Sequence, residues 1–199
     1  MNEQKTGMLI VLSGPSGVGK GTLCNMLIEN DESITFSTSV TTRAPRDYEV
    51  EGVHYFFITD EKYDELLKED AFVEHATVHG HRYGTLKSQI NQSIAAGMNV
   101  ILDIDPQGAR TVMKNCPGCV SIFILPPDYE TLRSRLHTRN TDDDAEIEKR
   151  LNNARGEIEQ MGLYDYAVIN DDLQTAYEQL RSILTAEKQR TIRFKPDIQ

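Results

Sequence analysis

A glycine-rich segment directly after an apolar run limits the possible folds more than any other feature of this sequence. The apolar run covers residues 8–12, and the segment after it reads Gly14-Pro15-Ser16-Gly17-Val18-Gly19-Lys20. This fits the pattern G-x-x-x-x-G-K, whose glycines allow successive backbone N–H groups to turn toward a phosphate. Helical spacing follows at Leu23, Met26 and Leu27. A strand, a glycine loop and a helix in this order predict the first unit of an α/β sheet that binds a nucleoside triphosphate.

The loop also indicates where the metal ion of a nucleotide would lie. Lys20 can neutralise the outer phosphates. Gly21 stands where the pattern has Ser or Thr, so we expect the hydroxyl of Thr22 to act toward a Mg²⁺-bound phosphate. Asp103 follows a predicted strand and suits the acidic role beside Mg²⁺ at the end of a neighbouring strand. The plainer interpretations are a glycine turn with a surface lysine, and a carboxylate that caps a turn.

Apolar runs and stretches of helical spacing alternate along the rest of the chain. Alternation of this kind predicts a mainly parallel sheet flanked by helices, as in P-loop NTPases. Asp60 and Asp128 are the expected caps of two of the helices. Strands are expected at residues 34–40, 55–58, 100–102, 120–125 and 166–170, and helices at about 60–67, 86–94, 129–136, 147–158 and 173–184.

Two stretches interrupt this alternation. Residues 39–85 are richer in Tyr, His and turn residues, and we interpret them as a small inserted domain of mixed α+β structure. Residues 137–146 are polar and acidic, which is typical of a short lid. The core of the domain, expected over residues 7–187, would then comprise 7–38 and 86–187, followed by a C-terminal tail over 188–199.

Composition narrows the class of protein. With 199 residues the chain has room for one domain with a modest insertion. It carries 21 Lys and Arg against 31 Asp and Glu, a net charge of −10, which argues against broad binding to nucleic acid or to anionic membranes. Three cysteines are a low, odd count for a disulfide-stabilised secreted domain. Since neither a signal peptide nor an apolar run of about 18 residues is evident, we expect a cytoplasmic protein.

Other polar residues allow more than one interpretation. Arg43 and Arg46 are three residues apart and could hold one phosphate through forked hydrogen bonds, although solvated arginine pairs are common. Cys116 and Cys119 have C-x-x-C spacing, but two further zinc ligands at similar spacing are not obvious, so we interpret them as part of a turn. We interpret three further candidates for metal ligands as polar residues of the insertion: His75, His79 and His81.

Six motifs in order carry a resemblance to a known family. The chain contains GPSGVGKGT, TTRAPR, EGVHYFF, FVEHATVHGHRYGT, ILDIDPQGA and VINDD. In sequence and spacing they resemble the guanylate kinase family over about residues 7–187. The resemblance implies transfer of the γ-phosphoryl group of ATP to GMP with Mg²⁺, in purine nucleotide metabolism and GMP recycling. It also implies an insertion that binds the nucleoside monophosphate. The sequence does not give the oligomeric state, and we expect a monomer or homodimer.

The resemblance further implies a role for each matching residue. The GMP phosphate would be held by Ser39, Arg43, Arg46, Tyr55 and Tyr83. Guanine would be recognised by Glu74 and Thr85, with Asp103 and Asp105 nearby. ATP would lie on the loop from Gly14 to Thr22, with Asn170 on the adenine side. The catalytic cations would be Lys20, Arg43 and the lid arginines Arg139 and Arg150, with Arg135 a less certain match.

The chain departs from the family pattern at two places, and other functions stay open. Many relatives have R-G-R-G in the lid, where this chain has Leu136-His137-Thr138-Arg139-Asn140. Gly21 makes the loop similar to that of adenylate kinases, so the loop alone does not identify the acceptor. One alternative is a relative that phosphorylates another acceptor, against which Glu74 and Thr85 argue. Another is a catalytically inactive protein-interaction module, against which the intact loop argues.

Overall fold

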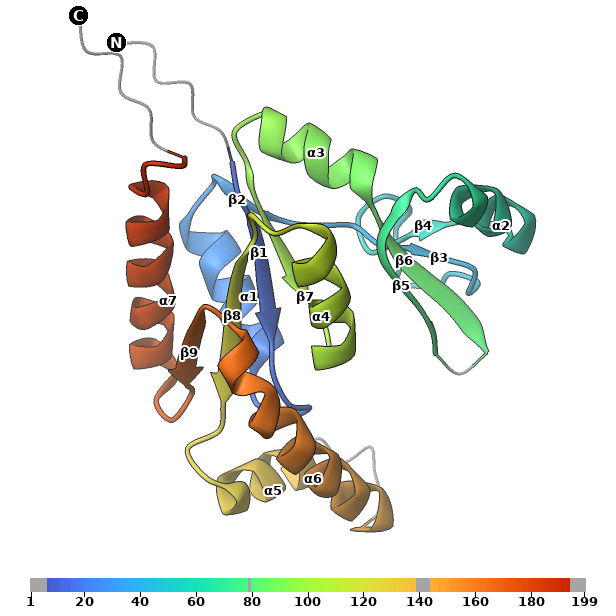
Figure 1. Ribbon diagram of the computed structural model, residues 1–199. Helices are drawn as coiled ribbons and strands as arrows, with labels where there is room; N and C mark the ends of the chain where they lie inside the picture. Colours follow the sequence, from blue (N-terminus) through green and yellow to red (C-terminus); the bar gives the residue numbers. More distant parts are fainter. Residues whose placement is uncertain (1–6, 79, 139–143, 194–199) are drawn as a thin grey trace, which may run out of the picture.

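The structure, a computed structural model, describes residues 7–78, 80–138 and 144–193 (Figure 1). Its larger sheet has the strand order β2-β7-β1-β8-β9, and all neighbouring strands are parallel. This confirms the predicted fold class, because β1 lies in the middle and the phosphate loop leaves its carboxyl end. The strands are β1 Leu9–Ser13, β2 Ile34–Phe36, β7 Asn99–Asp103, β8 Val120–Leu125 and β9 Tyr166–Ile169.

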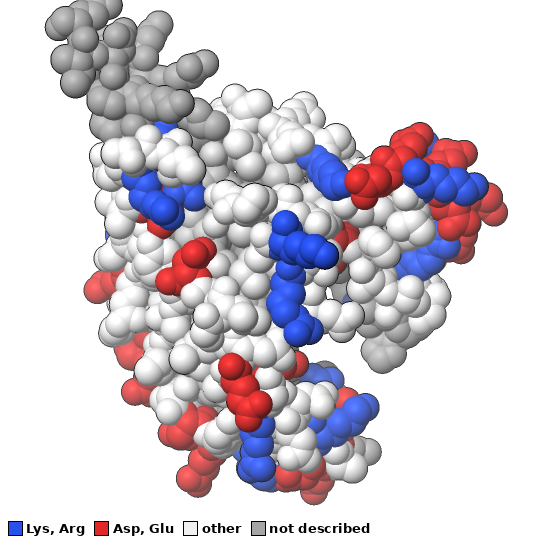
Figure 2. All heavy atoms as spheres, in the orientation of Figure 1, with Lys and Arg blue, Asp and Glu red and all other residues white. Residues whose placement is uncertain are grey.

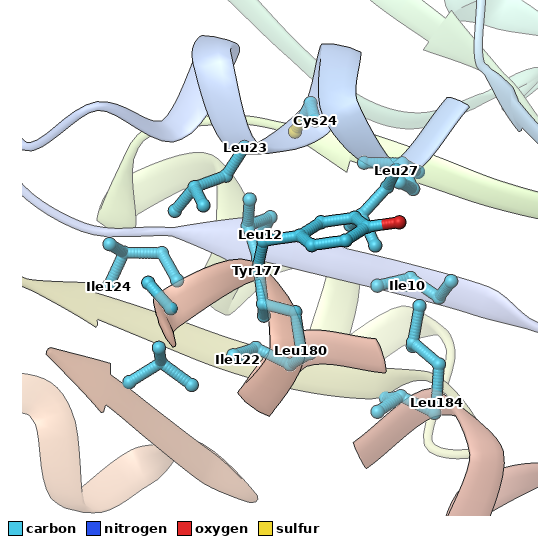
Figure 3. Packing of buried hydrophobic residues seen from close by; sticks show 14 of the residues in the cluster. Ile10, Leu12, Leu23, Cys24, Leu27, Ile122, Ile124, Tyr177, Leu180 and Leu184 are labelled. Atoms are coloured by element: carbon cyan, nitrogen blue, oxygen red, sulfur yellow. The ribbon is translucent and has the colours of Figure 1, made fainter. Parts of the chain in front are cut away.

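Helices cover both faces of this sheet. On one face, α1 (Lys20–Asn30) and α7 (Leu173–Lys188) enclose a core in which Leu23 and Leu180 meet Leu12 (Figure 3). On the other face, α3 (Lys87–Ala95) and α4 (Pro106–Asn115) pack over alternate residues of β1 and β7. All five residues of β1 are buried. A strand covered on both faces has no polar side, which is why its sequence is a continuous apolar run.

A second sheet occupies the stretch that interrupts the alternation. Its order is β4-β3-β6-β5, in which β3 is parallel to β4 and antiparallel to β6, and β5 and β6 form an antiparallel hairpin. Helix α2 (Asp60–Lys68) covers it through Tyr63, whose ring centroid lies 4.7 Å from that of Phe72. The strands are β3 Val40–Thr41, β4 Phe56–Phe57, β5 Phe72–Val78 and β6 His81–Leu86.

Two helices form a third unit beyond the carboxyl ends of the parallel strands. Helices α5 (Tyr129–Thr138) and α6 (Asp144–Ile158) have an apolar contact of their own, centred on Leu136, Ile147 and Leu151. A short 3-10 helix, Glu159–Leu163, leads from α6 to β9. Residues 139–143 of the expected lid lie outside the described residues, so only its two flanks are seen.

The structure corrects two predictions and adds elements that were not predicted. The strand expected at 34–40 is two strands in different sheets, because the chain leaves the larger sheet after Phe36 and joins the second at Val40. Thr59 rather than Asp60 caps α2, since the Thr59 hydroxyl accepts the Lys62 N–H at 3.2 Å. Asp128 accepts the Thr131 N–H at 2.6 Å, which confirms that cap. Strands β5 and β6 and helix α4 were not individually predicted.

Helix α4 had local signals that could have revealed it. Asp105 is its N-cap and accepts the Gly108 N–H at 2.7 Å, and Pro106 occupies the first turn. Both choices are typical of a helix start. The helix matters for the site because its first turn faces the carboxyl ends of the parallel strands. Among the described helices, none has the length and apolar character needed to cross a bilayer.

We expect the first glycine of the loop to be structurally required. At Gly14, φ is +142°, and a Cβ there would lie 2.3 Å from the Ile124 carbonyl oxygen. Gly14→Ala should therefore lower the free energy of unfolding by about 2–4 kcal/mol. Gly156→Ala is the matched control, because no atom lies within 4 Å of its added Cβ. In a helix that change should be neutral or stabilise by up to about 1 kcal/mol. Equal urea midpoints for the two variants would contradict the assignment.

Candidate active site at the carboxyl ends of the parallel strands

The loop between β1 and α1 has the shape of an anion cradle. Gly14, Gly17 and Gly19 have φ of +142°, +85° and +94°, values that side chains of L-residues rarely allow. Lys20 folds back over the loop, and its Nζ donates to the carbonyl oxygens of Gly14 at 2.7 Å and Pro15 at 3.1 Å. Together with the N-terminus of α1, this turn can surround a phosphate with N–H groups and a cation.

Neighbouring elements hold the loop from outside. Val18 is fully buried, and its carbonyl oxygen accepts a 2.8 Å hydrogen bond from Asn170 Nδ2 at the end of β9. A Cβ at Gly17 would lie 2.7 Å from Leu136 of α5, so the helix packs directly on the loop. Arg150 of α6 donates to Ser16 Oγ at 3.2 Å. The loop is therefore held by Asn170 at the end of β9 and by residues of α5 and α6.

Two clefts of about 380 Å³ each adjoin the loop. The first contains the predicted adenine-side residue Asn170 together with Thr22 and Arg135. Arg135 donates to the Asn170 carbonyl oxygen at 2.8 Å. The second has as its polar lining Ser16, Lys20, Asp103, Asp105 and Glu157.

The predicted Mg²⁺ ligands are divided between the two clefts. Thr22 lies in the first cleft and Asp103 in the second, where Gly21 is the neighbour of Asp103. The described residues contain no group of three or more His, Cys, Asp or Glu suited to a metal ion. Asp103 and Asp105 nevertheless present carboxylates in the cleft that contains Lys20. Mg²⁺ is commonly bound by one or two carboxylates together with substrate phosphates and water, and this donor set fits that mode. The role of Thr22 as a ligand stays a prediction.

A polar cluster lies on the second sheet. Glu74 and Thr85 are paired across β5 and β6, and the Thr85 hydroxyl donates to Glu74 Oε1 at 2.7 Å. The Ser39 and Thr85 hydroxyl oxygens are 3.4 Å apart. Thr85 is buried. Burial of the Glu74 carboxylate raises its pKa, while the hydrogen bond from Thr85 opposes this rise and the charge of Asp105 reinforces it. The structure thus brings these three predicted residues together.

Three of the predicted phosphate-binding residues form a second cluster at the same sheet: Arg43, Tyr55 and Tyr83. The guanidinium of Arg43 lies 5.6 Å from the centroid of the Tyr55 ring, which is 5.9 Å from that of Tyr83. Arg43 also pairs with Glu49 at 2.7 Å, and Arg46 Nη1 donates to the hydroxyl of Tyr48 at 2.8 Å. Glu49 was not predicted, because a single carboxylate in a polar loop gives no sequence signal.

The N-terminus of α4 connects the second sheet to the loop cleft. A Cβ at Gly108 would lie 3.2 Å from Asp105 Oδ1 and 3.7 Å from Glu74 Oε2. Asp105 in turn lines the cleft that contains Lys20. In the space-filling view, an opening separates the lobe that carries α2 from the lobe of α5 and α6 (Figure 2). Asp105 and Gly108 thus link Glu74 of the second sheet to the cleft that contains Lys20.

Some predicted residues lie elsewhere or outside the described chain. Arg139 is outside the described residues, as is His79. Cys116 and Cys119 are free thiols in a turn closed by the Cys119 N–H, which donates to the Cys116 carbonyl oxygen at 2.9 Å. Glu157 of α6 lines the loop cleft but was not predicted, and burial raises its pKa while the charge of Lys20 opposes this. Its spacing of seven residues from Arg150 places both on one face of α6, a signal that the sequence did contain.

A family model, relatives and a solved structure described as guanylate kinase match this chain. A family model described as Guanylate kinase matches residues 6–187. A relative from Caldanaerobacter subterraneus named Guanylate kinase is 47% identical over 98% of this chain and 95% of its own. Another with that name, from Clostridioides difficile, is 43% identical over 96% of this chain and 93% of its own. The crystal structure of guanylate kinase from Anaplasma phagocytophilum superposes with a TM-score of 0.73 at 36% identity, covering 96% of this chain and 92% of that one.

The raised pKa of Glu74 predicts a pH dependence of stability. The unfolded chain releases this proton near the ordinary value of 4.5, while the folded protein retains it to higher pH. Between those two pKa values the unfolded state binds fewer protons, so this group lowers the stability as the pH rises. In Glu74→Gln the amide can still accept from Thr85, but nothing titrates. The free energy of unfolding of the variant, relative to wild type, should therefore increase with pH above 4.5 and then level off. A difference independent of pH in urea titrations would show that Glu74 is not desolvated.

Proposed function

The chain belongs to the guanylate kinase family and transfers the γ-phosphoryl group of ATP to GMP, and we propose that the two nucleotides meet between the phosphate loop and the second sheet. The observation that carries this placement is the position of Gly108. Asp105 and Glu74 both approach it, and Asp105 shares a cleft with Lys20. A base held at Glu74 would therefore lie close to phosphates held on the loop. An inactive interaction module is not favoured, because the full-length relatives are named as kinases.

On the donor side, we place the phosphates of ATP on the backbone of residues 14–22 and against Lys20. The adenine side is the cleft that contains Asn170 and Arg135. The Asn170 Nδ2 group is committed to the Val18 carbonyl oxygen, while its Oδ1 is buried with no hydrogen-bond partner among the described residues. A buried acceptor of this kind is costly unless a donor reaches it. The amino group of adenine is a donor that would suit this cleft.

On the acceptor side, two clusters of the second sheet divide the recognition of GMP. The phosphate would be bound by Arg43 and Arg46 with the hydroxyls of Ser39, Tyr55 and Tyr83. The Glu74 carboxylate would accept from N1–H and N2–H₂ of guanine. The Thr85 hydroxyl, whose one proton is donated to Glu74 Oε1 in this structure, would turn to donate to O6. Adenine has a lone pair at N1 and a donor in place of O6, so both contacts would be mismatched.

The chemistry requires positive charge and exclusion of water. Phosphoryl transfer spreads negative charge over the equatorial oxygens of the transferred group, and fixed cations stabilise that charge. Lys20, Arg43 and Arg150 would supply this positive charge. Arg150 already contacts the loop at Ser16. Mg²⁺, held near Asp103 and Asp105, would supply further positive charge at the phosphates of ATP.

Closure of the two lobes over both nucleotides would exclude water and so limit hydrolysis of ATP. Arg139, the monomeric or homodimeric state and the cytoplasmic location stay predictions.

Lys20 provides a direct test of the donor side. Lys20→Met keeps most of the side-chain stem but removes the cation, so kcat should fall by about 10²-fold or more. A coupled assay of ADP formation with ATP and GMP measures this. Lys114→Met, an exposed lysine of α4, is the matched control and should have wild-type kinetics. A kcat within about threefold of wild type for Lys20→Met would remove Lys20 from the transition state.

Glu74 tests the choice of base. Sites that use buried hydrogen bonds discriminate by about 10⁴-fold, so AMP should be a very poor acceptor for the wild-type protein. Glu74→Gln turns one acceptor into a donor that faces N1–H or N2–H₂, so kcat/KM for GMP should fall by about 10²-fold or more with little change in the KM for ATP.

Protonation of Glu74 should have a similar effect. The kcat/KM of wild type for GMP should therefore decline as the pH falls toward the raised pKa of Glu74. Glu69→Gln, at an exposed position after α2, is the control for the substitution. Guanine recognition would have to be reassigned if wild type used AMP almost as well as GMP, or if Glu74→Gln left the reaction with GMP unchanged.

A further inference from the structure

The carboxylate of Glu49 is almost completely enclosed in a loop whose other side chains are mainly exposed. Only 5% of its side chain is accessible. Oε1 accepts from Arg43 Nη2 at 2.7 Å, and Oε2 accepts from the backbone N–H of Arg46 at 2.7 Å. The Glu49 N–H donates back to the Arg46 carbonyl oxygen at 2.9 Å. One side chain thus connects the guanidinium of Arg43 to the backbone that carries Arg46.

Further contacts hold the Arg43 side chain in the same conformation. Its Nη1 donates to the carbonyl oxygen of Ala44 at 2.8 Å, and its guanidinium lies over the ring of Tyr55. The Arg43 side chain is only 16% exposed. A long side chain that is fixed before its ligand arrives loses less conformational entropy on binding than a free one. The conformation of Arg43 is therefore largely set in the absence of a nucleotide.

The charge of Glu49 could have either of two effects on an anionic ligand. Arg43 lowers the pKa of Glu49 to about 2, so this carboxylate is ionised at any pH at which the protein is assayed. Its negative charge could compete with a phosphate for Arg43. Its two hydrogen bonds, however, engage a single nitrogen of the guanidinium and a backbone N–H. The guanidinium is a fork with several donors, so this geometry orients Arg43 without occupying all of them.

We propose that Glu49 is a positioning residue for the acceptor phosphate, which holds Arg43 and the Arg46 backbone in the conformation that receives it. The inference rests on the proposed binding of the GMP phosphate by these two arginines. It implies that Glu49 contributes to the binding of GMP without touching it. Its effect should be confined to ligands that carry a phosphate, because no described contact of Glu49 reaches the residues proposed to bind guanine.

The test compares two carboxylates of one loop and two ligands. Glu49→Gln keeps the shape of the side chain but removes the charge and one of the two acceptors. It should raise the KM for GMP by about 10- to 100-fold, the effect of losing a charge-assisted hydrogen bond, and leave the KM for ATP within about threefold of wild type. Glu51→Gln is the matched control and should leave both values unchanged, because Glu51 lies in the same loop and its carboxylate accepts the backbone N–H of Phe57 at 3.0 Å.

Binding of guanosine, which lacks the phosphate, separates positioning from folding. By calorimetry, Glu49→Gln should bind guanosine as wild type does while binding GMP more weakly. An equal loss for both ligands would mean that Glu49 only stabilises the inserted sheet. A lower KM for GMP would mean that Glu49 competes with the phosphate, and an unchanged KM that it has no role; either result overturns the proposal.

A double-mutant cycle with Arg43→Ala completes the experiment. If Glu49 acts through Arg43, most of its effect on GMP should disappear in the Arg43→Ala background. Additive losses would show that Glu49 acts by another route. If Arg43→Ala itself leaves the binding of GMP unchanged, the proposed phosphate site is wrong. If only Glu49→Gln is silent, the phosphate site stands and the inference about Glu49 fails.

Discussion

The close contact between the phosphate loop and its neighbours is the constraint on which the rest of this structure depends. At Gly14 the backbone approaches β8 so closely that a Cβ would overlap the Ile124 carbonyl oxygen, and at Gly17 it approaches Leu136 almost as closely. The buried Val18 and its hydrogen bond from Asn170 fix the other side. A loop held in this way presents its N–H groups in a fixed arrangement, which is the condition for electrostatic stabilisation without reorganisation.

The same contacts link phosphate binding to the parts of the protein that surround it. Helix α5 rests on Gly17 through Leu136, and α6 reaches Ser16 through Arg150. Helix α4 begins beside Asp105 and faces Glu74 of the second sheet. In the proposed closure, a movement of α5 and α6 would therefore reach the loop through packed atoms.

Charge is distributed to match this arrangement. The chain has a net charge of −10, yet the proposed reaction centre contains Lys20, Arg43 and Arg150. Carboxylates lie among these cations rather than being excluded from them. Asp103 and Asp105 share the cleft of Lys20, and Glu49 pairs with Arg43. In our proposal the first two serve the metal ion and Glu49 orients its arginine, so the acidic residues support the binding of anions.

The sequence by itself determined the phosphate loop, the parallel sheet and the family. Each depends on a local pattern: glycines at fixed spacing, continuous apolar runs for strands covered on both faces, and motifs in a fixed order. Even the missed helix α4 had a local signal in Asp105 and Pro106. Only the tertiary structure decided that residues 34–40 divide between two sheets, that Thr22 and Asp103 lie in different clefts, and that Glu49 holds Arg43. These outcomes depend on which distant segments pack together, and alternating residues in an extended segment are compatible with either sheet. A carboxylate in a polar loop has the same sequence signal whether it is solvated or enclosed, because its partner is chosen by the fold.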